Sequence, residues 1–286
     1  RNLLELLDMA VAALRRLGQY VQAPAATSGY VEKVVGELFT TREGFSLVVL
    51  RMAERLLKQG AELRLKTRAE RILREGDRGT AVIADDSGQA RTFPCAGLIS
   101  TAPITETARS FTPGLGPEAL AAAGALRFRA IVFVGLKVRR PRVLPASFMY
   151  FREHSFNRIT DFSHFSFHIK PEGRTLLVAE VTCGPADRVW SDDALARELV
   201  VADLVREGIL ARDEIEDAVV FRVRYGHPMY TLGYEAALET VLAAMGGLVN
   251  FETAGRQGRF QYVNMHIAMK MGAEAAERLA ARLPTE

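Results

Sequence analysis

Residues 247–283 read GLVNFETAGRQGRFQYVNMHIAMKMGAEAAERLAARL, the most informative pattern in the sequence. Its beginning, Leu248–Thr253, predicts a strand, and a polar turn with glycine and arginine follows. Asn264 then stands at the expected N-cap of a long helix, where its side chain can accept hydrogen bonds from first-turn amides. A helix N-terminus aimed in this way suits an anionic or polarised ligand. The predicted buried side of the helix consists of Ile267, Met271, Ala275, Leu279 and Leu283.

Length and charge favour two interleaved domains without a nucleic-acid partner. The chain has 286 residues, which is enough for one large domain or two modest ones. Its 37 Lys and Arg residues oppose 34 Asp and Glu residues, and the two signs are scattered along the sequence. Because nucleic-acid binding needs a concentrated basic surface, we expect none, and the expected ligand is a small-molecule substrate.

The cysteines and the hydropathy pattern predict a soluble, cytoplasmic protein. Cys95 and Cys183 lie far apart in apolar runs, so we expect buried thiols in a reducing compartment and no metal site. No apolar run approaches the ~20 residues that span a bilayer, and no transmembrane segment is expected. Peripheral membrane contact stays open, because 49% of the residues are hydrophobic.

The first part of the chain predicts helices that lead into strands. Apolar residues at helical spacing indicate helices over residues 2–22, 28–38 and 46–59. Two strands joined by a turn are predicted within residues 61–75, and further strands over residues 81–86, 90–95 and 95–103.

Residues 111–228 are rich in β-forming side chains. A long strand is predicted over Arg127–Lys137, and shorter strands over residues 147–151, 157–162, 175–183 and 218–225. The pair His227-Pro228 predicts the end of the last strand, and residues 233–245 predict a helix. A helix predicted over Asp192–Arg206 should bury one side, formed by Leu195, Leu199, Ala202, Leu204 and Val205.

The glycine fingerprint of dinucleotide-binding folds, G-x-G-x-x-G after a first strand, is absent from the sequence. The nearest match, Gly114–Ala119, follows Ser-Phe-Thr-Pro instead of a strand. Pro117 suits the first turn of an ordinary helix, so we interpret this match as a loop before a helix.

From about Thr41 onward, the order of segments resembles a group of FAD-dependent oxidoreductases: protoporphyrinogen oxidases, phytoene desaturases, amine oxidases and UDP-galactopyranose mutases. Residues 247–283 carry the resemblance, together with the segments 42–45, 67–72, 100–103 and 225–234. The last of these is similar to the family's Tyr-Pro-x-Tyr-Asp-Leu-Gly-Tyr segment. The resemblance implies an α/β fold (α+β mixed). In it, an incomplete Rossmann-like FAD-binding domain is interleaved with a substrate domain of mixed antiparallel sheet plus helices.

The resemblance also implies a division of the chain and a missing part. We expect a helical substrate-side segment at 1–40, parts of the FAD-binding domain at 41–110 and 229–286, and the substrate-binding sheet domain at 111–228. In the family the fingerprint lies near the N-terminus of a longer chain. We therefore expect this sequence to be a C-terminal portion or half of a split protein, with a missing segment or a partner chain supplying the fingerprint.

The implied cofactor is FAD, and the matching segments assign residues to it. Ala69, Thr101 and Pro103 would act through their main chain beside the adenine and the dinucleotide. Gly255 permits a close backbone approach, and Arg256 can meet phosphate or ribityl oxygens. The helix amides at Asn264, Met265 and His266 would face the flavin N1 and C2 carbonyl edge, with His266 at a position where an acidic residue is frequent in the family.

Five further residues are expected to line the substrate cavity. Arg42 and Gly44 belong to a turn that is similar to the family's glycine turn near the flavin, although Glu43 replaces its first glycine. His227, Tyr230 and Tyr262 are the other candidates, and His227 could equally be an ordinary turn residue before proline. No catalytic residue is assigned.

Three further histidines lie in a phenylalanine-rich stretch. These are His154, His164 and His168. Their spacing does not suit a metal site, so we expect a mixed core or an aromatic wall for the substrate.

The function implied is transfer of a hydride or an electron pair from an organic substrate to flavin N5. Two alternatives stay open. One is a redox-neutral isomerase like the mutase relatives, and the other is a non-catalytic partner subunit or fragment.

Overall fold

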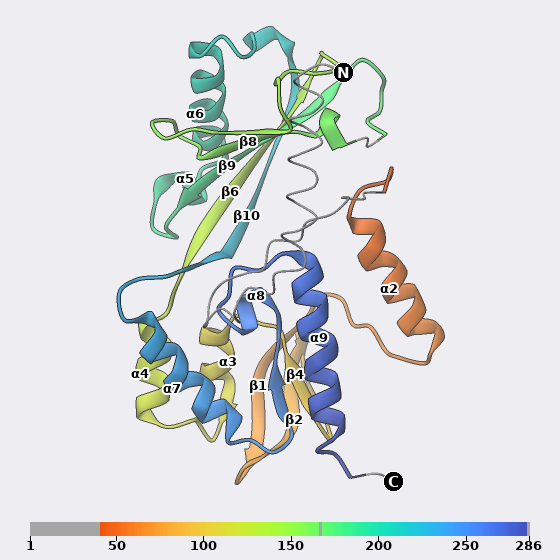
Figure 1. Cartoon of the computed structure of the whole chain (residues 1–286), viewed down its shortest axis with the longest axis vertical. Helices are drawn as coiled ribbons and strands as arrows, with labels where there is room; N and C mark the ends of the chain where they lie inside the picture. The colour runs from red at the N-terminus through yellow and green to blue at the C-terminus, as the bar shows by residue number, and fades with distance from the viewer. Residues whose placement is uncertain (1–40, 166–167, 285–286) are drawn as a thin grey trace, which may run out of the picture. The chain divides into compact units, whose positions relative to one another are not determined.

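A computed structural model describes residues 41–165 and 168–284 (Figure 1). The helices predicted over residues 2–22 and 28–38 lie outside the described residues. In the described part, sheets of five, four and two strands are accompanied by helices. This arrangement of mixed sheets and helices confirms the predicted α/β class.

The five-stranded sheet is antiparallel throughout and has the strand order β10-β6-β9-β8-β7. The strands predicted at residues 127–137, 147–151, 157–162 and 175–183 are confirmed by it. Their bounds are β6 (Arg127–Val138), β7 (Phe148–Tyr150), β8 (Arg158–Asp161), β9 (Thr175–Cys183) and β10 (Ile215–Met229), with a short 3-10 turn at Phe162–Phe165.

Strand β10 is longer than the sequence predicts, and the expected break at His227-Pro228 is wrong. The strand continues to Met229, with Pro228 paired to Phe128 after a register shift between Val223 and His227. Proline has no amide proton to donate, but β10 is the edge strand of the sheet and tolerates the loss. As a result, His227 is held on a strand and not in a flexible turn.

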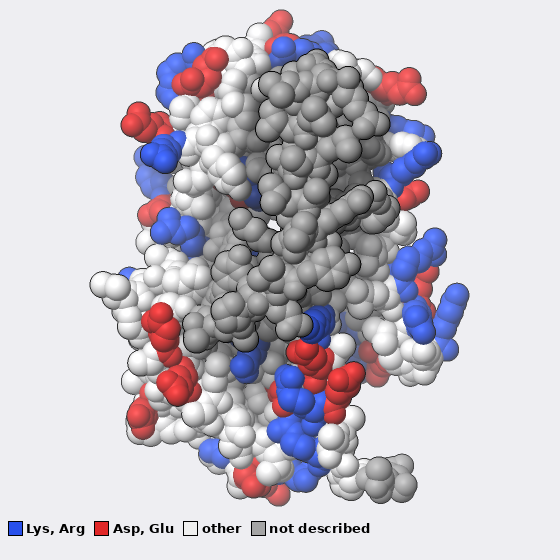
Figure 2. All heavy atoms as spheres, viewed as in Figure 1, with Lys and Arg blue, Asp and Glu red and all other residues white. Residues whose placement is uncertain are grey.

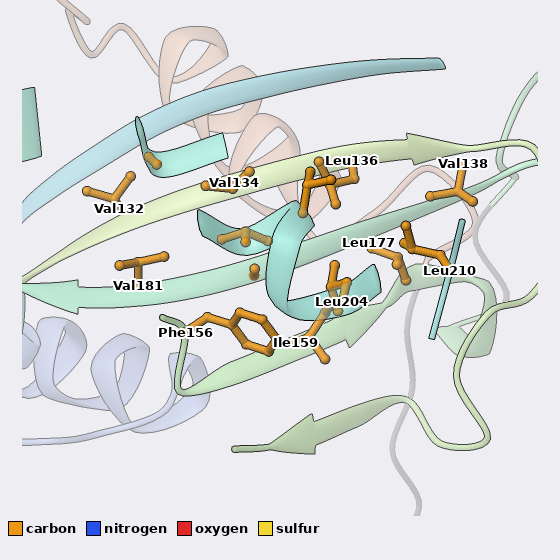
Figure 3. Close-up of a cluster of buried hydrophobic side chains, with 14 of the residues drawn as sticks. Val132, Val134, Leu136, Val138, Phe156, Ile159, Leu177, Val181, Leu204 and Leu210 are labelled. Atoms are coloured by element: carbon orange, nitrogen blue, oxygen red, sulfur yellow. The ribbon is translucent and has the colours of Figure 1, made fainter. Parts of the chain in front are cut away.

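One face of this sheet forms a hydrophobic core. Side chains alternate across β6, so every second one points into this core. Facing side chains of β8, β9 and the helix α6 (Asp193–Arg206) complete it, as Figure 3 shows. The members contributed by β6 are Ala130, Val132, Val134, Leu136 and Val138.

Helix α6 follows the short α5 (Arg188–Ser191), and its buried side coincides only in part with the predicted one. Leu204 is buried as predicted, whereas Leu199 and Val205 are 40% and 39% exposed. For these two residues the prediction is wrong, because the sheet is met mainly by smaller and β-branched side chains. One buried member, Asp203, is polar, and its carboxylate accepts from the Ser155 amide at 2.6 Å. The buried residues of α6 are Ala196, Val200, Val201, Asp203 and Leu204.

The four-stranded sheet is a meander, β3-β2-β1, with β5 added in parallel to β1. The strands predicted at 81–86 and 90–95 are confirmed, but residues 61–75 contain one strand instead of two. Residues 61–66 pair with no strand of the described chain, so this part of the prediction is wrong. The bounds are β1 (Thr67–Glu75), β2 (Arg78–Asp86), β3 (Gln89–Pro94) and β5 (Phe111–Thr112).

The two-stranded sheet joins β4 (Leu98–Ser100) in parallel with β11 (Phe251–Thr253). Both strands are shorter than the apolar runs predicted at 95–103 and 248–253. Helix α9 (Met265–Ala280) packs beside this pair (Figure 1). Ala275 and Leu279 of its predicted apolar side are buried, and Ile267 and Met271 are half-buried.

A second core lies between the helices and the small sheets. Helix α4 (Pro117–Ala125) packs along α7 (Tyr234–Gly246), and α3 (Ile104–Ser110) contacts α4 (Figure 1). Pro117 is the first residue of α4, which confirms the interpretation of Gly114–Ala119 as a loop before a helix. The residues before this loop are corrected, because Phe111 and Thr112 do form a short strand.

Helix α2 (Ser46–Lys58) confirms the helix predicted at 46–59, yet none of its residues is buried. On the face drawn in Figure 2, basic and acidic side chains of the described residues are intermixed. No described helix combines the length and the apolar character that crossing a bilayer requires. The exposed apolar side chains of α2 are Val49, Leu50, Met52, Leu56 and Leu57.

Candidate flavin and substrate site

The strand-turn-helix of residues 247–283 is fastened at its beginning by Asn250, which is 1% exposed. Its Nδ2 donates to the carbonyl oxygens of Gly79 and Ala96 at 2.7 and 2.8 Å. Its Oδ1 accepts from the Gly79 amide at 2.8 Å. Because three backbone groups depend on one side chain, the two of Gly79 being buried, Asn250 fixes β11 against β2 and the entry to β4.

The turn after β11 forms the short helix α8 (Gly255–Gly258). Gly255 has φ of +81°, and the space where a Cβ would lie is open. Gly258 is crowded instead: a Cβ there would lie 2.7 Å from Thr253 Oγ1 and 3.1 Å from the Ser100 carbonyl. The spacing of two glycines thus combines a left-handed entry to the turn with close packing against the end of β4.

The N-terminus of α9 keeps free donors. Asn264 is the N-cap as predicted, but its side chain makes no capping hydrogen bond, so that part of the prediction is wrong. The Asn264 side chain is exposed, and only its backbone carbonyl accepts, from Ala268 at 3.0 Å. Within the described chain, the amides of Met265, His266 and Ile267 have no hydrogen-bond acceptor. These amides and the helix dipole are available to an electron-rich ligand edge.

Arg256 is held by the chain itself. Its Nε and Nη2 donate to the Val263 carbonyl at 3.0 and 2.6 Å. Its Nη1 lies 3.3 Å from Nδ1 of His227, and its guanidinium lies 4.5 Å from the centre of the Tyr262 ring. The fork expected to meet phosphate or ribityl oxygens is therefore directed to protein groups, and it ties α8 to β10.

His227 stays neutral in this setting. Burial and then the positive charge of Arg256 lower the pKa of His227 below its ordinary value. Because a guanidinium only donates, Nδ1 of His227 must accept, and the single proton of the neutral ring lies on Nε2. The ring also lies 5.0 Å from the ring of Tyr262.

Tyr230 completes this group. Its hydroxyl accepts from the Tyr262 amide at 2.7 Å, and its ring lies 4.7 Å from the ring of Tyr234. The structure thus brings together Arg256 and three of the five predicted substrate-lining residues, His227, Tyr230 and Tyr262. Tyr262 lies in the turn that leads into α9, and Arg256 lies in α8, which contacts α9. His227 lies on β10, and Tyr230 follows directly after that strand.

The residues predicted to contact the adenine and the dinucleotide lie apart from the group around Arg256. Ala69 lines a cavity of about 230 Å³ between β1 and α3. Thr101 and Pro103 do not line this cavity, but their neighbours Ser100 and Ala102 do. Ser100 and Thr107 hydroxyls share a hydrogen bond of 2.9 Å, which fixes the turn from β4 into α3.

Arg42 and Gly44 lie elsewhere. They line a cavity of about 750 Å³ on the five-stranded sheet together with His168, whose amide donates to the Arg42 carbonyl at 3.0 Å. His154 lies instead beside Glu207, 2.9 Å away, and His164 contacts the Leu144 carbonyl at 2.9 Å. The three histidines of the phenylalanine-rich stretch therefore have different partners and do not converge.

Two structural residues of the site were missed. Gly258 is signalled in the sequence only by its spacing from Gly255, and Asn250 stands inside an apolar run where a buried amide has no evident sequence signal. Both act through packing or hydrogen bonds to backbone that is distant in sequence.

The residues present fit the flavin end of a dinucleotide cofactor. The open space at Gly255 permits close approach, and the unaccepted amides of α9 supply donors. The chemistry of this donor set matches a polar carbonyl edge better than a phosphate, because the Arg256 guanidinium already donates to Val263.

Comparisons with known proteins agree with this geometry. Residues 21–280 match the model of the family described as flavin containing amine oxidoreductase. The solved structure of a reduced UDP-galactopyranose mutase is similar with a TM-score of 0.70 and 19% identity, over 85% of this chain and 52% of that chain. The comparison with curated proteins gave no match.

Two further solved structures share the fold. A protein described as a putative protoporphyrinogen oxidase from Exiguobacterium sp. 255-15 has a TM-score of 0.60 and 18% identity, over 84% of this chain and 51% of that chain. A putrescine oxidase triple mutant has a TM-score of 0.59 and 19% identity, over 84% and 53%. The chain therefore spans about half the length of these structures.

The family match covers nearly the whole chain, whereas the solved structures, at these identities, support the fold. The predicted resemblance is confirmed, and FAD, the predicted cofactor, is confirmed at the level of the family. The chain belongs to the flavin containing amine oxidoreductase family.

Proposed function

We propose that this chain is the flavin-facing and substrate-binding part of an FAD-dependent oxidoreductase that acts on an organic small molecule. The observation that carries the proposal is the group of His227, Arg256, Tyr262 and Tyr230 beside the uncapped N-terminus of α9. FAD, when bound, supplies the two-electron chemistry, and the protein supplies binding, orientation and electrostatics.

The residues of the group have distinct tasks in this proposal. The amides of Met265 and His266, with the backbone of Asn264, would hold the carbonyl edge of the flavin, while Gly255 admits the cofactor to close range. Neutral His227 presents an Nε2 proton donor, and Arg256 keeps that tautomer in place.

The far end of the cofactor has its own candidates. We propose that Ala69, with the backbone of Thr101 and Pro103, borders the adenosine part. The cavity between β1 and α3 supports this for Ala69, and it supports the other two only through their neighbours Ser100 and Ala102. The phosphates need a glycine-rich loop, and we propose that a preceding segment or a partner chain supplies it. The exposed apolar side of α2 and the span of about half of the similar structures support this.

We also propose a reducing, cytoplasmic setting, which the thiols support. Cys95 and Cys183 are unbridged, and burial raises the pKa of both. A thiol kept protonated by burial is slow to oxidise.

Flavin absorbance tests the proposal. Purified protein is mixed with FAD, passed through gel filtration, and measured in the visible range. The expected result is retained absorbance, either in the 286-residue chain alone or when it is produced together with the polypeptide that carries the glycine fingerprint. If flavin absorbance is lost in both cases, the proposal is contradicted.

The isomerase alternative has a specific support, since the mutase structure has the highest TM-score among those described above. Substrate oxidation is distinguished by anaerobic mixing of the flavin-loaded protein with candidate substrates. An oxidoreductase bleaches the flavin absorbance in a single turnover, whereas a redox-neutral isomerase leaves it unchanged.

A further inference from the structure

The face of the five-stranded sheet opposite its hydrophobic core contains a long groove. Two adjoining cavities of about 510 and 750 Å³ lie on this face. They share walls on β6, β9 and β10, and the shared residues include Gly135, Leu176 and Val219. The groove is thus continuous and larger than a compact small molecule requires.

The floor of the groove is flat and aromatic. Phe133 of β6 stacks on Phe221 of β10, with ring centres 5.4 Å apart and an interplanar angle of 21°. Val219 and Phe221 are 50% and 52% exposed. Gly135 keeps the floor low, because a Cβ at that position would lie 3.1 Å from Val219 Cγ2. Exposed aromatic surface of this kind suits an apolar ligand.

One end of the groove is basic. Arg42, Lys137, Lys170 and Arg174 line the 750 Å³ cavity against two carboxylates, Glu43 and Asp217, so its lining residues have two more positive than negative charges. Arg174 is paired with Glu216, whose carboxylate also lies 3.4 Å from Lys137. Lys170 has no carboxylate partner among the described residues, and its ammonium remains available to a ligand anion.

The apolar cavity is the end of the groove nearer to His227, which itself lines neither cavity. Residues Arg129, Ile131 and Phe133 follow one another on the same side of β6, and His227 pairs with Arg129. The charges of Arg158 and Glu180, which line the apolar cavity, act on the pKa of His227. From Arg129 to Lys137 the strand advances eight residues, which is roughly 26 Å.

We infer that this groove binds the substrate of the proposed flavoenzyme, and that the substrate is an extended, largely apolar molecule with an acidic group at the end remote from His227. The inference rests on the proposed function, and it names the substrate class. The excess of positive charge at the remote end opposes a polyamine, and the apolar floor opposes a sugar nucleotide.

Three matched probes test the inference by fluorescence titration of the purified protein. The probes are a pyrene-labelled dodecanoic acid, its methyl ester and the corresponding long-chain amine. The acid is expected to bind roughly threefold to fivefold more tightly than the amine, as a partly exposed ion pair allows. Equal affinities for the acid and the amine would contradict the inference.

Two pairs of variants locate the binding. Val219→Trp fills the groove and is expected to weaken all three probes by about tenfold or more, since apolar contact area is lost. Val205→Trp, on the exposed side of α6, is its control and should change nothing. Lys170→Glu should remove the preference for the acid, whereas the control Lys270→Glu on α9 should keep it.

The outcomes separate this inference from the function on which it rests. If the protein retains flavin, and the Val219→Trp and Val205→Trp variants bind the probes with equal affinity, the result contradicts the groove but not the flavoenzyme. A protein that stays colourless both alone and together with the polypeptide that carries the glycine fingerprint, yet shows the acid preference and the Val219→Trp loss, supports the groove and contradicts the flavoenzyme.

Discussion

Arg256 Nη1 lies 3.3 Å from Nδ1 of His227, so a permanently charged guanidinium donates to a histidine ring that must stay neutral to accept. Burial and this charge lower the pKa of His227. A histidine with a lowered folded pKa contributes stability that is complete above about pH 6.5, the value in an unfolded chain. That stability is lost as the pH falls through the folded pKa.

Replacing Arg256 with Gln is predicted to raise the pKa of His227, because the nearest positive charge is removed while the ring stays buried. The measurement is an NMR titration of the histidine ring protons, with the His227 signal assigned from a His227→Asn variant. Arg188→Gln, at an arginine whose side chain is 84% exposed, is the control and should leave the titration unchanged. A His227 pKa equal in the Arg256→Gln and unmodified proteins would disprove the electrostatic coupling.

A second prediction concerns Asp161, which is fully buried at the loop side of β8. Burial alone would raise its pKa, but hydrogen bonds from Leu144, Val143, Thr175 and Ser163 outweigh burial and lower the pKa. The stability that this carboxylate contributes is therefore complete above about pH 3.9, and it is lost as the pH falls through the folded pKa.

Asp161→Asn is predicted to reduce the free energy of unfolding at pH 7 by about 2–3 kcal/mol, because an amide has one acceptor oxygen where the carboxylate has two. Urea unfolding should show this difference shrinking as the pH falls below 4. Asp77→Asn is the control, since the Asp77 side chain is exposed. A difference that stays constant with pH would show that the loss comes from packing and not from charge.

Much of the five-stranded sheet could be predicted from sequence, because its strands are rich in β-branched and aromatic residues. The bounds of β9 match the prediction, and β6 extends it by one residue. The end of β10 could not be predicted in this way. Whether proline interrupts a strand depends on the strand being at an edge, and edge position is a property of the whole sheet. Most of the buried side of α6, apart from Leu204, was missed for a related reason, since the sheet selects Ala196 and Val200 by their size.

Part of the candidate site followed from the motif, and part required the fold. The strand-turn-helix and its glycine turn could be recognised in the sequence, and so could Tyr262. The pairing of Arg256 with His227 could not, because 29 positions separate them and their contact depends on β10 continuing through Pro228. The sequence suggests phosphate or ribityl oxygens as partners of Arg256, whereas the fold directs that side chain to Val263 and His227.

A third prediction tests Asn250 as the fastening point of β11. Asn250→Asp keeps the shape but places a carboxylate against the carbonyl oxygens of Gly79 and Ala96, which lose their donors. The expected loss in the free energy of unfolding is about 3 kcal/mol or more. Asn157→Asp is a matched control, because the Asn157 side chain only accepts hydrogen bonds, from Thr182. Similar losses for the two variants in denaturant unfolding would contradict this role.

The last prediction compares Gly258 and Gly272, which differ in the space available for a Cβ atom. Ala at Gly258 would place its Cβ against Thr253 Oγ1 and the Ser100 carbonyl, so the β11 turn must shift away from β4. Gly258→Ala is expected to lower the free energy of unfolding by about 1–3 kcal/mol and to weaken FAD retention. Gly272→Ala is the control: it lies within α9 in open space and should stabilise the protein by up to about 1 kcal/mol.

Both glycine variants are compared by thermal unfolding with and without FAD. Gly272 lies in α9, and Gly258 lies in the turn before it. A change in FAD retention that appears in both variants would therefore indicate that the stability of α9 controls FAD binding. A change confined to Gly258→Ala would instead assign that control to the packing of the β11 turn on the end of β4. We expect the second result, since the close contacts of Gly258 are with Thr253 of β11, Ser100 of β4 and the adjoining turn, and not with α9.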